Sequence, residues 1–271
     1  MLILLSPAKN LNFDPAPGAP APTKPALLKD ASELAAVAKK LSKAQIKRLM
    51  SISDKLAELN HERFQALRAD GKSNGAKQAA LAFNGDVYLG LDAKTMSKDD
   101  FAFAQNHLRI LSGLYGLLRP LDAIEPYRLE MGSKLKNPRG ANLYEFWGDR
   151  IAQEINKAAK DQKDPTIVNL ASNEYFSAVD LSVLKGPLVT PTFKEEKDGQ
   201  LRQLQFFAKR ARGLMARWMI DNRIDNARDL KKFNVEGYRL AETSKDGASL
   251  LFVRPQPPLK QPARAKKKAA A

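Results

Sequence analysis

The chain contains no cysteine and only two histidines, His61 and His107, in 271 residues. The absence of cysteine excludes disulfides, thiolate metal sites and a cysteine nucleophile. Two histidines leave few ways to build an imidazole-rich zinc or iron site, so a tightly held metal would depend on carboxylates. Both histidines fall on predicted helices among polar neighbours, and we predict neither a metal site nor a cofactor.

Long apolar runs and common catalytic motifs are also missing. The run from Met1 to Leu5 is too short for a membrane span or a secretory signal, which predicts a cytoplasmic protein without a membrane partner. No Gly-x-Ser-x-Gly elbow, Walker loop, Gly-x-Gly-x-x-Gly or His-Glu-x-x-His pattern occurs. These motifs therefore assign no catalytic residue and no enzyme class.

Positive charge is abundant, with 45 Lys and Arg against 30 Asp and Glu, a net charge of +15. Such an excess favours polyanionic partners such as nucleic acid. Residues 255–271 are rich in Pro, Ala and Lys, contain no acid, and carry five cations: Lys260, Arg264, Lys266, Lys267 and Lys268. This composition predicts a disordered basic tail that either solubilises the chain or contacts nucleic acid nonspecifically. Removing these five from the excess of 15 leaves +10 for residues 1–254, which we predict to form one domain.

Apolar patterns predict an α+β fold, a single mixed α/β domain with short buried strands. Residues 2–5 and 166–170 are typical of strands buried on both faces. Helical spacing predicts helices over 31–50 and 53–67, with Ser42 and Ser53 as N-caps, and over 148–160. We expect a bent strand over 79–91 and one helix over 98–121 that breaks at or before Arg119-Pro120. Two hairpins with Lys-Asp-Gly turns, 191–207 and 233–255, flank a helix over 208–224.

The helix after Phe207 carries the strongest local signal for a basic face. Its apolar stripe contains Phe207, Ala211, Leu214 and Trp218. Lys209, Arg212 and Arg223 lie opposite this stripe, with Arg210 and Arg217 on one flank. The sequence leaves two interpretations open, a phosphate-binding surface and a solvated amphipathic helix.

The segment HLRILSGLYGLLRP is a second candidate for phosphate binding. Gly113 and Gly116 in a short hairpin between helices would aim backbone N–H groups at a phosphate, with Arg109 and Arg119 nearby. The alternative is that these glycines only allow close packing.

Polar residues follow the predicted strands and form a third candidate. Because parallel strands bring their carboxyl ends to one edge, we expect these residues to converge in an anion or nucleotide cleft. They are Ser6, Lys9 and Asn10 after the first strand, Ser172, Asn173, Glu174 and Tyr175 after the second, and Asn84 and Asp86 between them. Turn formation and helix capping are the alternative explanation.

Several stretches together resemble the bacterial YaaA family of peroxide-stress proteins. They are SPAKNL at 6–11, ISDKLAELN at 52–60, FNGDVYLGL at 83–91, LRILSGLYGLLRPLDAIEPYRLEMG at 108–132, LYEFWGD at 143–149, NLASNEYF at 169–176 and FAKRARGLMARWMI at 207–220. The likeness runs from Met1 to about Arg254. Asn10 departs from it, where threonine is more usual, and the Lys-rich tail extends past the usual end.

The resemblance implies a cytosolic protein of unusual mixed α/β topology that responds to hydrogen peroxide, lowers free iron and so limits Fenton damage. It also implies double-stranded DNA binding through a positively charged cleft and a helix-hairpin-helix-like element. Carried over by position, that element is Ser112 to Gly116 with Arg109 and Arg119, and the cleft cations include Lys9, Lys209, Arg210 and Arg212. An enzyme acting on a nucleotide or another phosphorylated small molecule in the strand-end cleft is the alternative function.

Overall fold

A computed structural model describes residues 1–70 and 75–258. Most of the predicted basic tail, from residue 259 onward, lies outside these described residues. The first half of the chain is mainly helical and contains β1 (Leu2–Leu5), α1 (Leu28–Lys39), α2 (Lys43–Met50), α3 (Asp54–Ala66), β2 (Lys77–Gln78), α4 (Ala79–Ala82), α5 (Asp86–Leu91), η1 (Ala93–Thr95), α6 (Lys98–His107), β3 (Leu108–Ser112), β4 (Gly116–Leu118) and β5 (Ala123–Ile124).

The second half supplies the rest of the main sheet and its longest helix. It contains α7 (Leu143–Trp147), α8 (Arg150–Ala159), β6 (Ile167–Leu170), α9 (Asn173–Phe176), β7 (Leu188–Lys197), β8 (Gln200–Arg202), α10 (Gln205–Asp221), η2 (Ala227–Lys232), η3 (Val235–Gly237), β9 (Arg239–Thr243) and β10 (Ser249–Pro255). The fold is a single mixed α/β domain with a mostly parallel sheet, as the sequence predicts. No helix in the described ranges has the length and apolar character needed to cross a membrane.

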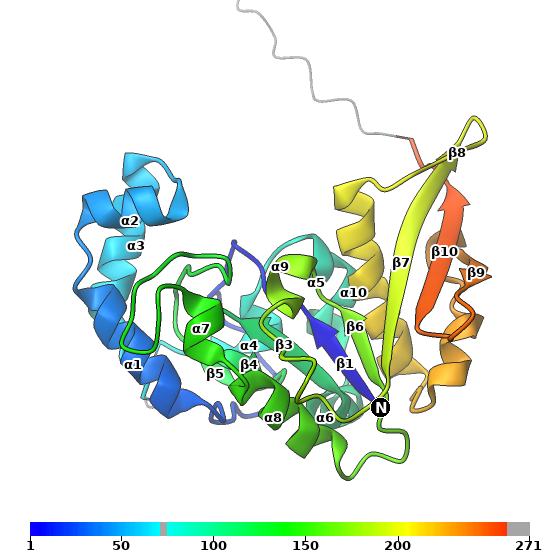
Figure 1. The fold of residues 1–271 in the computed structure, drawn as a ribbon, viewed down its shortest axis with the longest axis horizontal. Helices are drawn as coiled ribbons and strands as arrows, with labels where there is room; N and C mark the ends of the chain where they lie inside the picture. The colour runs from blue at the N-terminus through cyan, green and yellow to red at the C-terminus, as the bar shows by residue number, and fades with distance from the viewer. Residues whose placement is uncertain (71–74, 259–271) are drawn as a thin grey trace, which may run out of the picture.

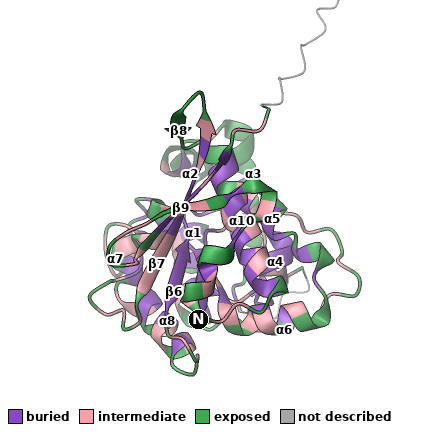
Figure 2. Ribbon diagram, turned by 90° about the vertical axis from the view of Figure 1, so that its right-hand side faces the viewer, coloured by how far each residue is buried: buried purple, intermediate pink, exposed green. Residues whose placement is uncertain are grey.

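The main sheet has the strand order β4-β3-β1-β6-β7-β10-β9, and β8 pairs with β7. Strand β1 lies parallel to both β3 and β6, while β7 is parallel to β6 and β10. Figure 2 shows the sheet between two helical layers, with α7 and α8 on one side and α4, α5, α6 and α10 on the other. Because helices cover both faces, β1 and β6 are entirely buried, which explains their apolar sequences.

Two segments differ from the predicted secondary structure. Residues 108–118, expected to continue a helix, form the antiparallel pair β3–β4, so the predicted helix-hairpin-helix-like element is a β-hairpin. A leucine run buried on all sides has no helical or strand period, so its pattern misleads. Residues 79–91, expected to form a bent strand, form the helices α4 and α5 on either side of Asn84-Gly85.

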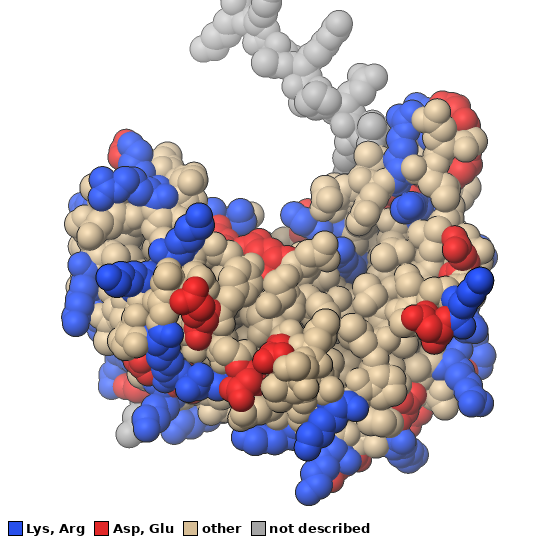
Figure 3. Space-filling model, viewed as in Figure 1, with Lys and Arg blue, Asp and Glu red and all other residues tan. Residues whose placement is uncertain are grey.

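The helices α2 and α3, which we call the α2–α3 arm, stand away from the sheet. Ser42 and Ser53 cap them as predicted, each accepting a hydrogen bond from the backbone N–H three residues later. In Figure 1 this arm rises at one end of the molecule and the β7–β8 hairpin rises at the other. The space-filling view in Figure 3 shows a hollow between them, which we call the concave face.

Candidate functional site

A cleft of about 760 Å³ opens where β1 and β6 end, at the floor of the concave face. Strand β1 is followed in the chain by β3 on one side of it and later by β6 on the other, so the sheet order reverses at β1. In open α/β sheets the carboxyl ends of strands at such a reversal are the usual place for a ligand. The topology therefore selects this cleft as the first candidate site.

The predicted convergence of the strand-end residues is confirmed. The Ser6 hydroxyl accepts a hydrogen bond from the Ser172 N–H at 2.8 Å, and the two hydroxyl oxygens lie 3.3 Å apart. These two residues are 166 positions apart in the sequence and join the ends of β1 and β6. All the predicted strand-end residues line the same cleft: Ser6, Lys9, Asn10, Asn84, Asp86, Ser172, Asn173, Glu174 and Tyr175.

Helix α10 forms the opposite wall and contributes Lys209 and Arg212. Arg212 is half-buried, and burial lowers the pKa of its guanidinium. Neither Lys209 nor Arg212 has a hydrogen-bond or ion-pair partner among the described residues. A partly desolvated cation without an anion is costly, so this wall is suited to an anionic ligand.

Helices α5 and α10, which both contribute residues to the cleft, are in close backbone contact. A Cβ on Gly213 would lie 1.8 Å from the carbonyl oxygen of Val87, and a Cβ on Gly90 would lie 2.3 Å from that of Arg210. The two glycines therefore let the helix backbones touch. As a result, the helices that carry Asp86 and Arg212 have a fixed relative position, and both residues line the cleft.

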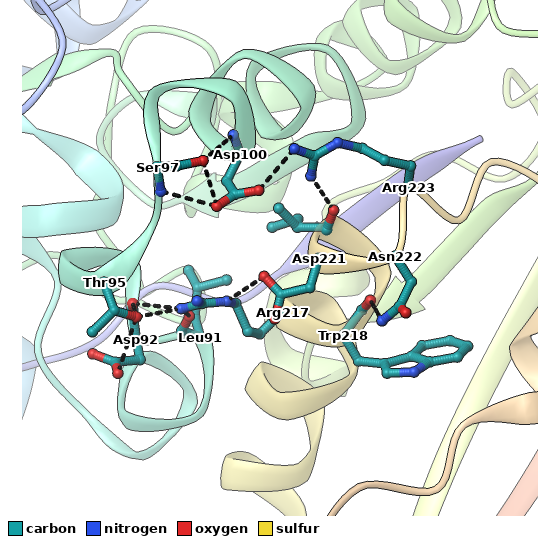
Figure 4. Close-up of polar contacts among 11 residues, drawn as sticks. Leu91, Asp92, Thr95, Ser97, Asp100, Arg217, Trp218, Asp221, Asn222 and Arg223 are labelled. Atoms are coloured by element: carbon teal, nitrogen blue, oxygen red, sulfur yellow. Dashed lines mark hydrogen bonds and ion pairs between the residues drawn. The ribbon is translucent and has the colours of Figure 1, made fainter.

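Two of the predicted basic-helix residues point away from the cleft. Arg210 donates to Glu236 at 2.6 Å, which raises the pKa of Arg210 and lowers that of the carboxylate. Arg217 donates to Asp221 at 2.7 Å and to the Thr95 hydroxyl at 2.6 Å (Figure 4). Both arginines thus tie α10 to neighbouring segments. The structure does not bring them to Lys209 and Arg212.

The glycine-containing hairpin is buried in the core. A Cβ on Gly113 would lie 2.2 Å from the carbonyl oxygen of Leu129, and Gly116 packs against Trp147. Arg109 donates to the carbonyl oxygens of Gln105 and Leu108, and burial lowers its pKa to about 10. Gly113 and Gly116 therefore allow close packing, which is the alternative interpretation of this segment. No phosphate can reach the two glycines in this conformation.

Arg119, at the end of the same hairpin, is held by Asp122. Its side chain donates to the Asp122 carboxylate at 2.9 Å and to the Lys24 carbonyl oxygen at 2.9 Å. The structure therefore places neither Arg109 nor Arg119 in the strand-end cleft.

A second groove, of about 610 Å³, lies between the α2–α3 arm and the loop after Met131. Its cations are Arg48, Lys134 and Lys136, and no acid lines it. A hydrogen bond of 3.1 Å from the Gly132 N–H to the Glu174 carboxylate joins this loop to the strand-end cleft. These three cations are not among the residues predicted from the sequence, although the lysines on either side of the buried Leu135 in SKLKNP are a signal that points to them.

The comparisons with known proteins assign the family. A family model described as peroxide stress protein YaaA matches residues 1–244. The chain belongs to the YaaA family. Similar relatives include a UPF0246 protein of Maricaulis maris, 58% identical over 95% of this chain and 97% of the relative. A UPF0246 protein of Phenylobacterium zucineum is 56% identical over 95% and 96%, and one of Alteromonas mediterranea is 51% identical over 94% and 99%.

Proposed function

We propose that the chain acts in the response to hydrogen peroxide by binding double-stranded DNA, without sequence preference, across the concave face. The family assignment supports the stress response. The observation that carries DNA binding is a set of six cations along this face: Arg48, Lys134, Lys136, Lys9, Lys209 and Arg212. Among the described residues, Lys9 alone of the six has an acidic partner, Glu130 at 3.4 Å.

Unpaired cations are what a polyanion requires. Each phosphate neutralised by Lys or Arg releases counterions and adds affinity that falls with salt. Exposed ion pairs, by contrast, already have an anion in place. The arm, the groove and the cleft offer several such cations on one side of the molecule, a surface suited to a long charged ligand such as a duplex.

Iron storage receives less support than DNA binding. Within the residues that the structure describes, no group of three or more His, Cys, Asp or Glu side chains is arranged to hold a metal ion. The lowering of free iron, which the family resemblance implies, is therefore not assigned to a metal site among these residues.

The test compares two triple variants of the full chain by fluorescence anisotropy with a short duplex between about 50 and about 200 mM salt. Changing Arg48, Lys134 and Lys136 to Gln removes the groove cations, and the slope of log affinity against log salt should fall by up to about 2.7. The matched control changes Lys185, Arg228 and Lys231 to Gln, exposed residues near the amino ends of β6 and β7, and should leave the slope nearly unchanged.

Two outcomes would contradict the proposal. One is the absence of salt-dependent duplex binding by the unaltered protein. The other is an equal loss in both triple variants, because a uniform response would show that net charge alone, and not the concave face, determines affinity.

A further inference from the structure

The strand-end cleft carries charges of both signs, which DNA phosphates alone do not explain. Lys209 and Arg212 occupy the α10 wall, and Asp86 occupies the α5 wall. The Asp86 carboxylate has no hydrogen-bond or ion-pair partner among the described residues, and no ion pair joins it to Arg212. A surface built only for phosphates gains nothing from a carboxylate, which repels them.

Asp86 on α5 and Arg212 on α10 line the same cleft, yet no ion pair joins them among the described residues. The backbone contact between the two helices at Gly90 and Gly213 fixes their relative position, and both charges stay available to a ligand. This arrangement fits a ligand with an anionic group at one end and hydrogen-bond donors at the other. Hydroxyls of a sugar and amines of a base are such donors.

The rim between the walls supplies uncharged polar groups. Asn10, Asn84 and Asn173 line the cleft, together with the linked hydroxyls of Ser6 and Ser172. Tyr175 adds an aromatic side chain that is mostly buried. A volume of about 760 Å³ exceeds what a phosphate ion fills and lies in the range of small-molecule sites, about 300–1,000 Å³.

We propose that this cleft binds a single nucleotide, with its phosphate at Lys209 and Arg212 and its sugar or base donors at Asp86. The nucleotide is either free or one unit of a nucleic-acid strand, since both sources present the same groups. The site shares Lys209 and Arg212 with the duplex surface described above, and Asp86 is the residue that distinguishes nucleotide binding from duplex binding.

The experiment measures binding to the full chain by thermal shift and by calorimetry. The ligands are AMP, GMP, CMP and dTMP, with adenosine and inorganic phosphate as partial ligands. At least one nucleotide should raise the melting temperature more than either partial ligand does at the same concentration. Arg212→Gln should weaken nucleotide binding at least tenfold, whereas Asp86→Asn should weaken nucleotide binding and leave or improve phosphate binding.

Control variants separate this site from the duplex surface. Arg228→Gln removes an exposed cation elsewhere and should leave nucleotide affinity unchanged. The Arg48, Lys134 and Lys136 triple variant should lose duplex affinity but retain nucleotide binding, so that failure of one proposal is distinguishable from failure of the other. If Arg212→Gln fails to fold, Lys209→Gln provides the same test at an exposed position.

A single-stranded oligonucleotide distinguishes the two sources. Mononucleotide binding identifies a free ligand, whereas oligonucleotide binding that is lost in both Arg212→Gln and Asp86→Asn identifies a unit of a strand. The proposal is overturned if no nucleotide and no oligonucleotide binds in an Asp86-dependent way, or if inorganic phosphate alone reproduces the whole effect.

Discussion

Two groups of cations in this molecule differ in what they face. On the concave face, Lys209, Arg212 and Arg48 have no acidic partner among the described residues. On the far side of α10, Arg217 and Arg223 are each paired, with Asp221 and Asp100 respectively (Figure 4). Helical periodicity groups Lys209 and Arg212 with Arg217 and Arg223, but their partners divide the cations of the molecule into binding cations and structural cations.

The difference has a physical origin in how α10 is covered. Lys209 and Arg212 on this helix line the cleft, while the segment 92–100 contacts Arg217 and Arg223 toward its C-terminal end. A cation beside neighbouring carbonyls and carboxylates stabilises the fold, since it satisfies groups that would otherwise be buried without partners. Lys209 and Arg212, beside the cleft, make no such contact among the described residues.

Arg254 is the extreme case of a structural cation, and its loss should have the largest effect. Its guanidinium lies 3.6 Å from Glu195, which is fully buried, and 3.0 Å from Glu236. Arg254→Met leaves the Glu195 charge uncompensated, so the free energy of unfolding should fall by about 3–5 kcal/mol in urea denaturation. Arg239→Met, an exposed residue paired across the strands with Val253, is the control and should cost less than about 1 kcal/mol. An equal loss of unfolding free energy in both variants would contradict the division into binding cations and structural cations.

Gly213→Ala tests the backbone contact between α5 and α10 beside the cleft. The new methyl group meets the Val87 carbonyl oxygen, so α5 and α10 must separate at a cost of about 1–3 kcal/mol. Alanine has the better helix propensity by about 1 kcal/mol, and a net loss therefore understates the cost of the contact. Urea denaturation measures this loss, and unchanged stability would show that the helices shift without penalty.

Arg217 was predicted from the sequence to bind DNA, but the structure shows it paired within the fold. Arg217→Gln should therefore lower stability without lowering DNA affinity. Loss of its hydrogen bonds to Asp221 and Thr95 should lower the free energy of unfolding by about 1–2 kcal/mol. Duplex affinity, measured by anisotropy, should stay within about twofold of the unaltered protein. A large loss of duplex affinity with an unchanged free energy of unfolding would show instead that Arg217 contacts DNA.

His107→Gln should give the smallest effect, seen only as a change in pH dependence. Burial lowers the pKa of His107, whose ring hydrogen-bonds the Met1 carbonyl oxygen and stacks on Phe103. The folded state therefore binds fewer protons than the unfolded chain, so stability is present above the unfolded pKa of about 6.5 and is lost as pH falls through the folded pKa.

The measurement compares melting temperatures at about pH 8 and about pH 5, on either side of the unfolded pKa. The unaltered protein should lose more stability on acidification than the variant does. An identical loss in both proteins would show that His107 does not contribute to the pH dependence.

How far the sequence predicted the molecule depended on whether local signals decided the structure. Strands β1 and β6 were predictable because a short apolar run between turn-forming residues is typical of a buried strand. The caps at Ser42 and Ser53 were predictable because a serine hydroxyl accepts hydrogen bonds from the first free N–H groups of a helix. The convergence of Ser6 and Ser172 followed from parallel strand pairing.

What the sequence could not give were features set by tertiary contacts. Leu108 to Leu118 became a hairpin because β1 lies beside it, and residues 86–91 became a helix packed on α10. Glu236, which pairs with Arg210, and the 92–95 segment, to which Arg217 also donates, are distant in sequence, so helical periodicity alone cannot tell these arginines from Arg212. The groove cations Arg48 and Lys134 come together only when the arm folds against the loop after Met131.

The position of β1 between β3 and β6 has a consequence for synthesis on the ribosome. This strand is made about 100 residues before its first partner and about 160 before its second, so at about 5–20 residues per second it waits roughly 8–30 s for the second one. Its four apolar side chains have no sheet to join during that time. The Ser6–Ser172 rim is therefore among the later features to form, and the nascent chain depends on protection of this segment by other surfaces or by chaperones.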